Sequence, residues 1–289
     1  MNPNTSPAVP FVDLTRLSCE IGPIVLADWT ACAKSASFIE GPRVAALEQQ
    51  LATVLGVPHV VCCANGTDAI VLGLLEMGIG KGDIVALPNM TFWATYEAIV
   101  TVGATPVLVD VDPDDLQLSL SQLREAHEHY GLNAVVLVHL FGWASAHLTG
   151  IRAFCRSEAI PLLEDGAQSF GVETYPRFPE PGRVKPILAD ATIGTLSFYP
   201  AKVIGSCSDG GAVTCQTERQ AATLRSLRNH GRGSANYEHA LVGLNSRMGA
   251  LSAAYLSHVV AMADRILDSR REAVRAYGEA LDGRNGLKV

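Results

Sequence analysis

The chain has 289 residues and a mass of 30.7 kDa, which fits one large α/β domain or two smaller domains. Its 48% hydrophobic and 18% charged residues exclude a disordered, collagen-like or coiled-coil chain. The 22 basic and 29 acidic residues give a net charge of −7. This balance argues against a broad nucleic-acid surface, because such a surface needs clustered Lys and Arg.

The seven cysteines are odd in number and include no C-x-x-C pair. They therefore favour buried free thiols in a reducing cytoplasm over a disulfide framework or a structural metal site. The N-terminal stretch MNPNTSPAVPF has neither the basic start nor the apolar core of a signal peptide. No uninterrupted run of 18 apolar residues is present, so we expect a cytoplasmic protein with no membrane span.

Short β-branched runs alternate with longer helical segments along most of the chain. The expected strands are Val60–Ala64, Ile84–Pro88, Pro106–Val111, Ala134–His139, Pro161–Glu164, Thr192–Phe198 and Gly211–Cys215. The helices expected between the first five strands are Thr67–Met77, Thr91–Val102, Ser119–Tyr130 and Ala146–Ala159. Near-continuous apolar strands separated by helices predict one large α/β domain, with a mainly parallel seven-stranded sheet and helices on both faces.

Two segments interrupt this alternation. Residues 173–185 are dense in Pro and charge, which predicts a surface excursion. From Ser246 to Leu281, apolar residues recur at steps of three or four, which predicts one long helix or two in series.

Ligands of open α/β sheets bind beyond the carboxyl ends of the strands. The first such place is ANGT, where Asn65 and Gly66 turn the chain and a helix starts at Thr67. Free N–H groups and the helix dipole make this turn a ready anion site, to which Thr67 adds a hydroxyl. The structural alternative is an ordinary strand-to-helix turn capped by Thr67 or Asp68.

Two further strand ends carry charged residues. Asp165 ends a nearly all-apolar strand, where a carboxylate is costly unless it meets a cation or a donor. Its structural alternative is a helix N-cap. Lys202 follows Pro200 in a run of apolar and small residues, where burial would leave a nucleophilic amine. The alternative is a lysine that extends to water.

An anion cradle, a carboxylate and a reactive lysine at strand ends are together what pyridoxal 5′-phosphate needs. The cradle takes the phosphate, the carboxylate keeps the ring nitrogen protonated, and the lysine forms an imine. Phe92 and Trp93, at a third strand end, offer an aromatic ring to cover the cofactor, and their spacing leaves open which one does so.

Nine segments in the same order resemble the DegT/DnrJ/EryC1/StrS family of pyridoxal-phosphate sugar aminotransferases. They are FIEGPRVAALEQQLATVLGV, ANGTDAI, GKGDIVALPNMTFWATYEAI, GATPVLVDVDP, HLFG, EDGAQSFG, SFYPAKVIG…DGGA, LRNHGR and GLNSRMGALSAAYL. The resemblance runs from VPFVDL to about Leu281. It implies fold type I of the pyridoxal-phosphate enzymes, which is like that of aspartate aminotransferase.

The resemblance also implies a role for each matching residue. Lys202 matches the Schiff-base lysine and proton carrier, Asp165 the partner of the ring nitrogen, and Gln168 the residue that bonds the ring hydroxyl. The remaining cofactor contacts implied are Gly66 and Thr67 at the phosphate, Ser197 as a further phosphate ligand, Phe92 stacked on the ring, and Asn245 reaching the phosphate of a neighbouring subunit in a homodimer. Trp93 takes the next position and is expected to pack.

The implied reaction moves an amino group, commonly from L-glutamate, to a keto sugar attached to a nucleoside diphosphate, as in amino-sugar biosynthesis. The form SFYPAK resembles members that act at the 3-keto carbon more than those that act at C4. A keto-inositol substrate is left open. A dinucleotide site at Gly78–Asp83 is set aside, because those glycines follow a helix rather than a strand.

Family members continue past the long helix into a small C-terminal domain, whereas this sequence has eight residues after Leu281. We therefore expect a cofactor-binding domain over residues 1–245, followed at 246–289 by the long helix leading into a truncated small domain. The alternative to an active enzyme is a catalytically silent cofactor-binding homologue or partner subunit.

Overall fold

The computed structural model describes residues 10, 12–174, 184–233 and 237–281. Most of the surface excursion expected over residues 173–185 lies outside these ranges. Its two flanks, β6 (Glu173–Thr174) and β7 (Lys185–Pro186), pair as a short antiparallel ribbon.

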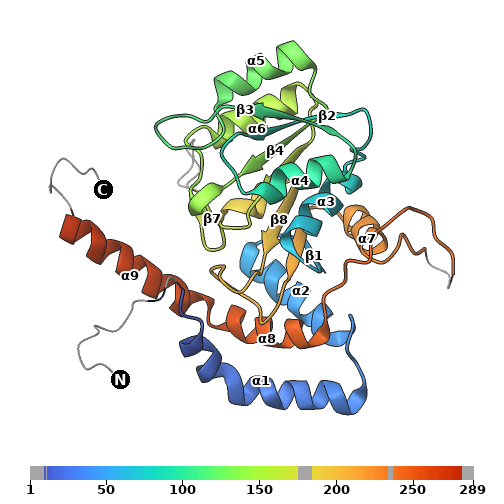
Figure 1. Ribbon diagram of the computed structural model, residues 1–289, viewed down its shortest axis with the longest axis vertical. Coiled ribbons are helices and arrows are strands. Elements are labelled where there is room, and N and C mark those ends of the chain that lie inside the picture. Colours follow the sequence, from blue (N-terminus) through green and yellow to red (C-terminus); the bar gives the residue numbers. More distant parts are fainter. Residues whose placement is uncertain (1–9, 11, 175–183, 234–236, 282–289) are drawn as a thin grey trace, which may run out of the picture.

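Seven strands form the central sheet, as expected (Figure 1). They are β1 (His59–Cys63), β2 (Ile84–Pro88), β3 (Thr105–Val109), β4 (Ala134–Val138), β5 (Leu162–Asp165), β8 (Ile193–Ser197) and β9 (Gly211–Cys215). Their spatial order is β1-β9-β8-β5-β4-β2-β3. Only β9 runs against its neighbours in this sheet. The carboxyl ends of the other six strands therefore share one edge, where the chemistry is expected.

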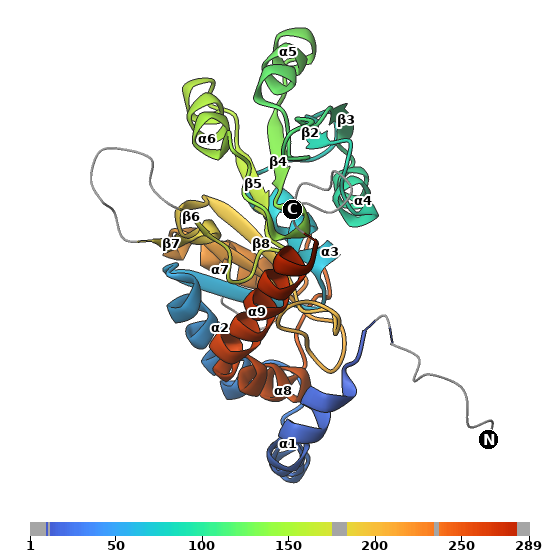
Figure 2. The same cartoon turned by 90° about the vertical axis from the view of Figure 1, so that its left-hand side faces the viewer.

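Helices cover both faces of the sheet (Figures 1 and 2). The α-helices are α1 (Thr15–Ser35), α2 (Pro42–Leu55), α3 (Gly66–Glu76), α4 (Trp93–Thr101), α5 (Leu120–Tyr130), α6 (Leu148–Ser157), α7 (Glu218–Leu227), α8 (Ala250–Ala261) and α9 (Ala263–Leu281). Short 3-10 turns are η1 (Leu140–Gly142) and η2 (Ile187–Asp190). Helices α3, α4 and α7 pack in one apolar cluster, and α2, α5, α6 and α8 pack in another.

The expected α/β class and seven-stranded sheet are confirmed. Most element ends move by no more than two residues, but the helix expected from Ser246 begins at Ala250. The segment 246–281 forms two helices in series, α8 and α9, which meet at Met262. The N-terminal helices α1 and α2 add to the expected elements, and both pack against α8. The domain division after residue 245 stays a prediction.

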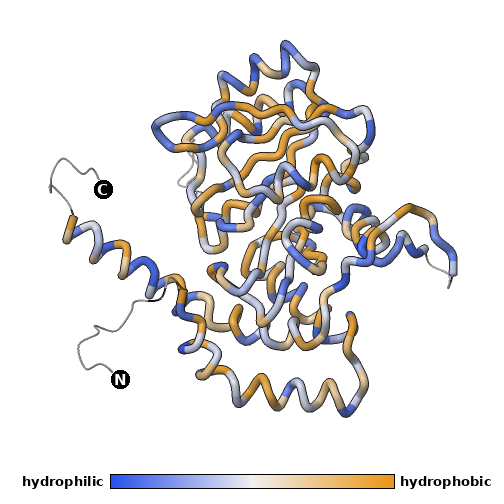
Figure 3. The backbone as a smooth tube through the Cα atoms, in the orientation of Figure 1, coloured by the Kyte–Doolittle hydropathy of each residue, from blue (hydrophilic) through white to orange (hydrophobic). Residues whose placement is uncertain are grey.

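The core follows the hydropathy of the strands. In Figure 3 the central strands are mostly orange, whereas α5 and α9 alternate between blue and orange. All five residues of β4 are buried, as expected for a strand covered on both faces. Within the described residues, the helices are all too short or too polar to span a lipid bilayer.

Candidate active site

The turn between β1 and α3 forms a cradle made of backbone. Asn65 is the N-cap residue, and its side chain accepts a hydrogen bond from the Asp68 N–H at 2.8 Å. The cap is therefore neither Thr67 nor Asp68. The first N–H groups of a helix have no acceptor within it, so those of Gly66 and Thr67 are free to bind an anion.

Glycine is required where this turn meets the neighbouring strands. A Cβ atom added to Gly66 would lie 2.7 Å from Ser197 Cβ at the end of β8. One added to Gly211 of β9 would lie 2.2 Å from the Asn65 carbonyl oxygen. The absence of side chains here brings Ser197 directly beside the start of α3.

A buried ion pair supports the strand that leads into the cradle. Arg228 Nη1 donates to Glu48 Oε1 and to the Cys62 carbonyl oxygen, each at 2.6 Å. Glu48 Oε1 also accepts from the Cys62 N–H at 2.9 Å. Farther along, the Ala64 N–H donates to Ser246 Oγ at 3.2 Å. These bonds fix the backbone just before the cradle.

Asp165 lies at the carboxyl end of β5 with 5% of its surface exposed. Its carboxylate accepts from the Ala167 N–H at 3.0 Å and, over longer distances, from Thr195 Oγ1 at 3.4 Å and Thr95 Oγ1 at 3.3 Å. Burial raises the pKa of Asp165, while the Ala167 N–H and the Lys202 charge act to lower it. Residues 166–172 form turns rather than an α-helix, so Asp165 is not a helix N-cap.

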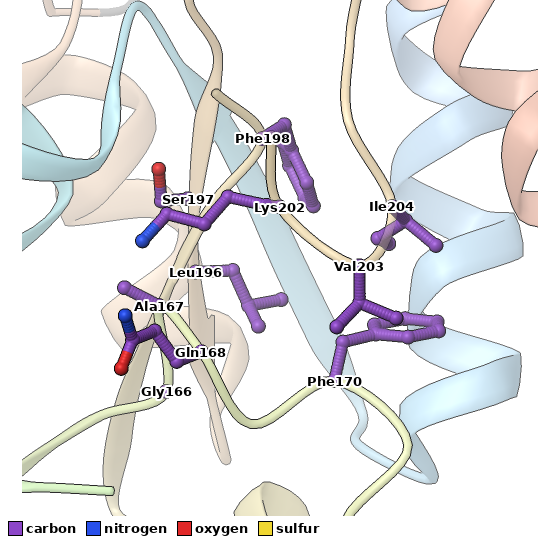
Figure 4. A pocket seen from close by; sticks show the side chains of 10 residues that line it. All are labelled: Gly166, Ala167, Gln168, Phe170, Leu196, Ser197, Phe198, Lys202, Val203 and Ile204. Atoms are coloured by element: carbon purple, nitrogen blue, oxygen red, sulfur yellow. The ribbon is translucent and has the colours of Figure 1, made fainter. Parts of the chain in front are cut away.

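Lys202 follows β8 in a turn closed by its own N–H, which donates to the Tyr199 carbonyl oxygen at 2.8 Å. Its side chain is half-buried and lines a small pocket with Ser197 and Gln168 (Figure 4). Burial lowers the pKa of Lys202, and the nearby Asp165 charge opposes that shift.

Gln168 lies in the turn that follows Asp165. Its Oε1 accepts a hydrogen bond from the Phe141 N–H at 2.7 Å. This bond leaves the amide NH₂ of Gln168 as the group able to donate to a ligand. The loop after β5 thus supplies a carboxylate and an amide donor to the same strand edge.

Phe92 precedes α4 and is 70% exposed, and Trp93 is 65% exposed. The Trp93 ring stacks on Tyr96, with centroids 5.0 Å apart. Both rings are thus open to solvent in this chain, and the expected packing of Trp93 is limited. Thr95, one turn beyond Phe92, bonds Asp165 and so places this segment beside the carboxylate.

Asn245 lies away from these contacts. Its Oδ1 accepts from Arg247 Nη2 at 2.8 Å and from Arg247 Nε at 3.1 Å. It forms an isolated β-bridge with Asn229 and is exposed. The adjacent Ser246 contacts the end of β1, so the Asn245 segment borders the cradle from outside.

The structure therefore gathers Gly66, Asp165, Gln168, Ser197 and Lys202 at one sheet edge. Thr67 and Phe92 begin the helices beside them. Sequence reasoning missed the supporting residues, which are Thr95, Thr195, His139, Arg152, Glu48 and Arg228. The repeat of hydroxyls one turn apart at Thr91 and Thr95 could have pointed to Thr95, whereas the others become visible only in the fold.

Residues 21–289 match the DegT/DnrJ/EryC1/StrS aminotransferase family. The chain belongs to this family. It is 37% identical over 283 residues to UDP-N-acetyl-3-dehydro-alpha-D-glucosamine 3-aminotransferase of Acidithiobacillus ferrooxidans, covering 98% of this chain and 73% of that protein. It is 33% identical to UDP-2-acetamido-2-deoxy-3-oxo-D-glucuronate aminotransferase of Pseudomonas aeruginosa, covering 94% of this chain and 73% of that one.

Solved structures of the family share the fold. The crystal structure of S. venezuelae DesV in complex with a ketimine intermediate superposes with a TM-score of 0.88 at 32% identity. The match covers 96% of this chain and 72% of DesV. The family and the fold type expected from the sequence are thereby confirmed. Because its family and its named relatives are aminotransferases, the chain is an aminotransferase.

Proposed function

We propose that this aminotransferase uses pyridoxal 5′-phosphate to transfer an amino group to the 3-keto carbon of a nucleotide-linked sugar. L-Glutamate is the proposed donor, and amino-sugar biosynthesis in the cytoplasm is the proposed setting. Lys202, half-buried in a pocket and close enough to the buried Asp165 for their charges to interact, is the observation that carries the proposal. The names of the two curated relatives, both aminotransferases of 3-oxo sugars, support the choice of carbon.

The start of α3 offers groups that would bind the phosphate. The N–H groups of Gly66 and Thr67 point from the start of α3, where the helix dipole favours an anion. The side chain of Ser197 lies beside Gly66 because glycine leaves no Cβ between them. These three residues would hold the phosphate.

The ring would lie between Asp165 and Phe92. A protonated pyridine nitrogen would give Asp165 the cationic partner that its buried carboxylate lacks when Lys202 is neutral. Gln168 would donate its amide NH₂ to the ring hydroxyl, since its Oε1 is taken by Phe141. Phe92 would cover the open face of the ring with its exposed side chain.

When bound, pyridoxal phosphate supplies an aldehyde that carries the amino group and a ring that accepts electrons. Lys202 would provide the amine that holds this aldehyde, because burial lowers the pKa of Lys202 and favours its uncharged, nucleophilic form. Once released, the Nζ atom would move a proton between the substrate carbon and the cofactor carbon. Asp165 would place its carboxylate against the ring nitrogen.

A second subunit is part of the proposal. Asn245 is exposed, and its Oδ1 is oriented by Arg247, which leaves its amide NH₂ able to donate across an interface. We propose a homodimer in which Asn245 reaches the phosphate held by the partner subunit. The hydrogen bond between Ser246 and Ala64 would connect the Asn245 segment to the cradle of its own subunit.

The test supplies purified protein with pyridoxal phosphate, L-glutamate and a UDP-linked 3-keto sugar, and measures 2-oxoglutarate and the amino sugar. The proposal expects both products in equal amounts, with a 4-keto sugar and a keto-inositol reacting more slowly. Cofactor binding without transfer to any of the three would identify a silent cofactor-binding homologue and overturn the proposed activity.

A further inference from the structure

The segment that follows β4 fits closely against the turn that carries Asp165 and Gln168. The His139 N–H donates to the Asp165 carbonyl oxygen at 3.0 Å, and the Phe141 N–H donates to Gln168 Oε1 at 2.7 Å. A Cβ atom on Gly142 would lie 2.9 Å from the Gln168 carbonyl oxygen, and its φ of 79° also favours glycine. Residues 139–142 therefore form a rigid support for Asp165 and Gln168, the two residues that contact the ring in the proposed function.

Behind this support lies a buried cluster of three titratable side chains, His139, Glu164 and Arg152. Arg152 Nε and Nη2 donate to the two oxygens of Glu164, both at 2.8 Å. His139 Nε2 lies 3.1 Å from Glu164 Oε2. The side chains of Glu164 and His139 are 1% and 0% exposed. A buried ion pair is a costly way to stabilise a core, so its value here lies in fixing position.

The cluster occupies the face of the sheet opposite to Asp165. Successive side chains of a strand alternate between faces, so Glu164 points toward α6 whereas Asp165 points toward α4. Arg152 Nη2 also donates to the Ile187 carbonyl oxygen at 2.8 Å. The Ile187 N–H in turn donates to the carbonyl oxygen of Val172, which ends the turn after Asp165. The cluster thus ties down both ends of that turn.

The cluster also acts through charge. Burial raises the pKa of Asp165, while the charges of Lys202 and His139 lower it. From α6, Cys155 also approaches Glu164, and burial raises its pKa to about 12, so it is uncharged at neutral pH.

We propose that His139, Glu164 and Arg152 are positioning residues, which hold Asp165 and Gln168 against the ring of the cofactor from the far face of the sheet. This inference rests on the proposed function. The His139 ring is fixed by Glu164, and Glu164 is fixed by the two-pronged contact with Arg152. None of the three needs to touch the cofactor.

The first test measures binding of pyridoxal 5′-phosphate and of its 1-deaza analogue, whose ring has carbon in place of nitrogen, to the apoprotein. Arg152→Met should weaken binding of pyridoxal phosphate about tenfold, the loss of roughly one hydrogen bond, and should change binding of the analogue much less. The matched control is Arg156→Met, an exposed arginine of the same helix, which should change neither. Equal losses for both compounds would mean a merely structural role and would overturn the inference.

The double variant Arg152→Met with Glu164→Gln removes both members of the buried ion pair, and therefore tests the inference should the single variant fail to fold. It should show the same selective loss of pyridoxal phosphate binding. In an Asp165→Asn background the effect of Arg152→Met should shrink to the part that acts through Gln168, because the ring-nitrogen contact is already gone. Persistence of the full effect in that background would contradict the inference.

The second test needs no cofactor. Carbon-13 carboxyl NMR of the apoprotein, with the Asp165 signal assigned by Asp165→Asn, measures the pKa of Asp165 directly. His139→Gln should raise it, because His139 is one of the groups that lower the pKa of Asp165. Arg152→Met should raise it as well, because a loosened turn weakens the bond from the Ala167 N–H to Asp165, and Arg156→Met should not. An unchanged Asp165 titration in both variants would overturn the inference even if the cofactor binds. If the wild-type protein binds no pyridoxal phosphate, the proposed function fails and the titration still decides the role of the cluster.

Discussion

Glu164 and Asp165 are neighbours on one strand, both almost fully buried, yet their surroundings shift their pKa values in opposite directions. For Glu164, burial acts to raise the pKa, but hydrogen bonds from His139 and Arg152 outweigh it and lower the pKa. For Asp165, burial prevails and the pKa is raised. Glu164, on the α6 side of the strand, has charged hydrogen-bond partners within the chain, whereas Asp165, on the α4 side, has few strong partners.

This difference separates a structural charge from a functional one. A buried carboxylate with a two-pronged arginine partner is complete as it stands. One that has a short bond from a single backbone N–H, two long hydroxyl contacts and a reactive lysine nearby is arranged for a ligand that brings its own positive charge. Substitutions on the α4 side should therefore reduce activity with little loss of stability, and those on the α6 side should reduce stability and, through the position of Asp165, weaken cofactor binding.

The largest effect is expected for Lys202→Ala. Because no other described residue of the pocket offers an amine, amino transfer from glutamate should fall by about 10⁴-fold, the upper range for loss of a proton-transferring group. The apoprotein should keep its melting temperature. Lys185→Ala serves as the control, since Lys185 is an exposed lysine paired with Asp190. Near-normal turnover in Lys202→Ala would contradict a catalytic role for the α4 side of the strand.

Asp165→Asn should lower amino transfer by about 10³-fold, because a neutral amide cannot stabilise positive charge on the ring nitrogen. Steady-state rates at saturating glutamate measure this effect. A fall in the melting temperature of the apoprotein that matched the loss of activity would instead indicate that Asp165 has a structural role.

Glu164→Gln should destabilise the apoprotein by about 3 kcal/mol at neutral pH, because Arg152 loses its ionic partner in the interior. Asp165→Asn should stabilise it, because the native state no longer has to hold a buried, poorly paired anion. Urea denaturation of the three apoproteins measures both changes. Equal signs for the two variants would contradict the comparison.

The two carboxylates also predict opposite pH dependence. The folded-state pKa of Glu164 is lowered, so its stabilisation is present above its unfolded pKa and is lost as the pH falls through the folded value. The folded-state pKa of Asp165 is raised, so ionisation of Asp165 costs stability as the pH rises from 3.8 through the folded value. The deficit of Glu164→Gln should therefore shrink in acid, and the gain of Asp165→Asn should vanish there.

Gly66→Ala is expected to have the smallest effect, weakening binding of pyridoxal phosphate by about tenfold. The added Cβ would displace Ser197 from the cradle. Gly73→Ala, in the same helix, is the matched control, because its Cβ would meet Leu163 Cδ1 at 2.6 Å in the core. The control should lose stability and keep its affinity. Unchanged affinity in Gly66→Ala, with weakened binding in Gly73→Ala, would mean that the cradle does not bind the cofactor.

The sequence was sufficient for the sheet because its strands are short, apolar and β-branched. The expected bounds of β2 and β9 coincide with those observed. Helix α1 does not show a clear pattern, since Pro23 interrupts it and apolar Ile24 and Leu26 are exposed. Its few buried residues, Ile21, Val25 and Cys32, lie on a helix that packs against α8, which is distant in the sequence.

The site divides in the same way. Lys202 and Asp165 could be predicted, because a charged residue at the end of an apolar strand is conspicuous in sequence alone. Arg152 could not be predicted, because the sequence around a half-buried helix residue does not indicate a partner on a strand twelve residues later. Its role depends on the packing of α6 against β5, which only the folded chain displays.

The most direct test of the central claim is to locate the covalent attachment of the cofactor. Protein mixed with pyridoxal 5′-phosphate is reduced with borohydride, digested and analysed by mass spectrometry. The account predicts one pyridoxyl group per chain, on Lys202. An unmodified chain, or a label spread over other lysines with Lys202 free, would contradict it.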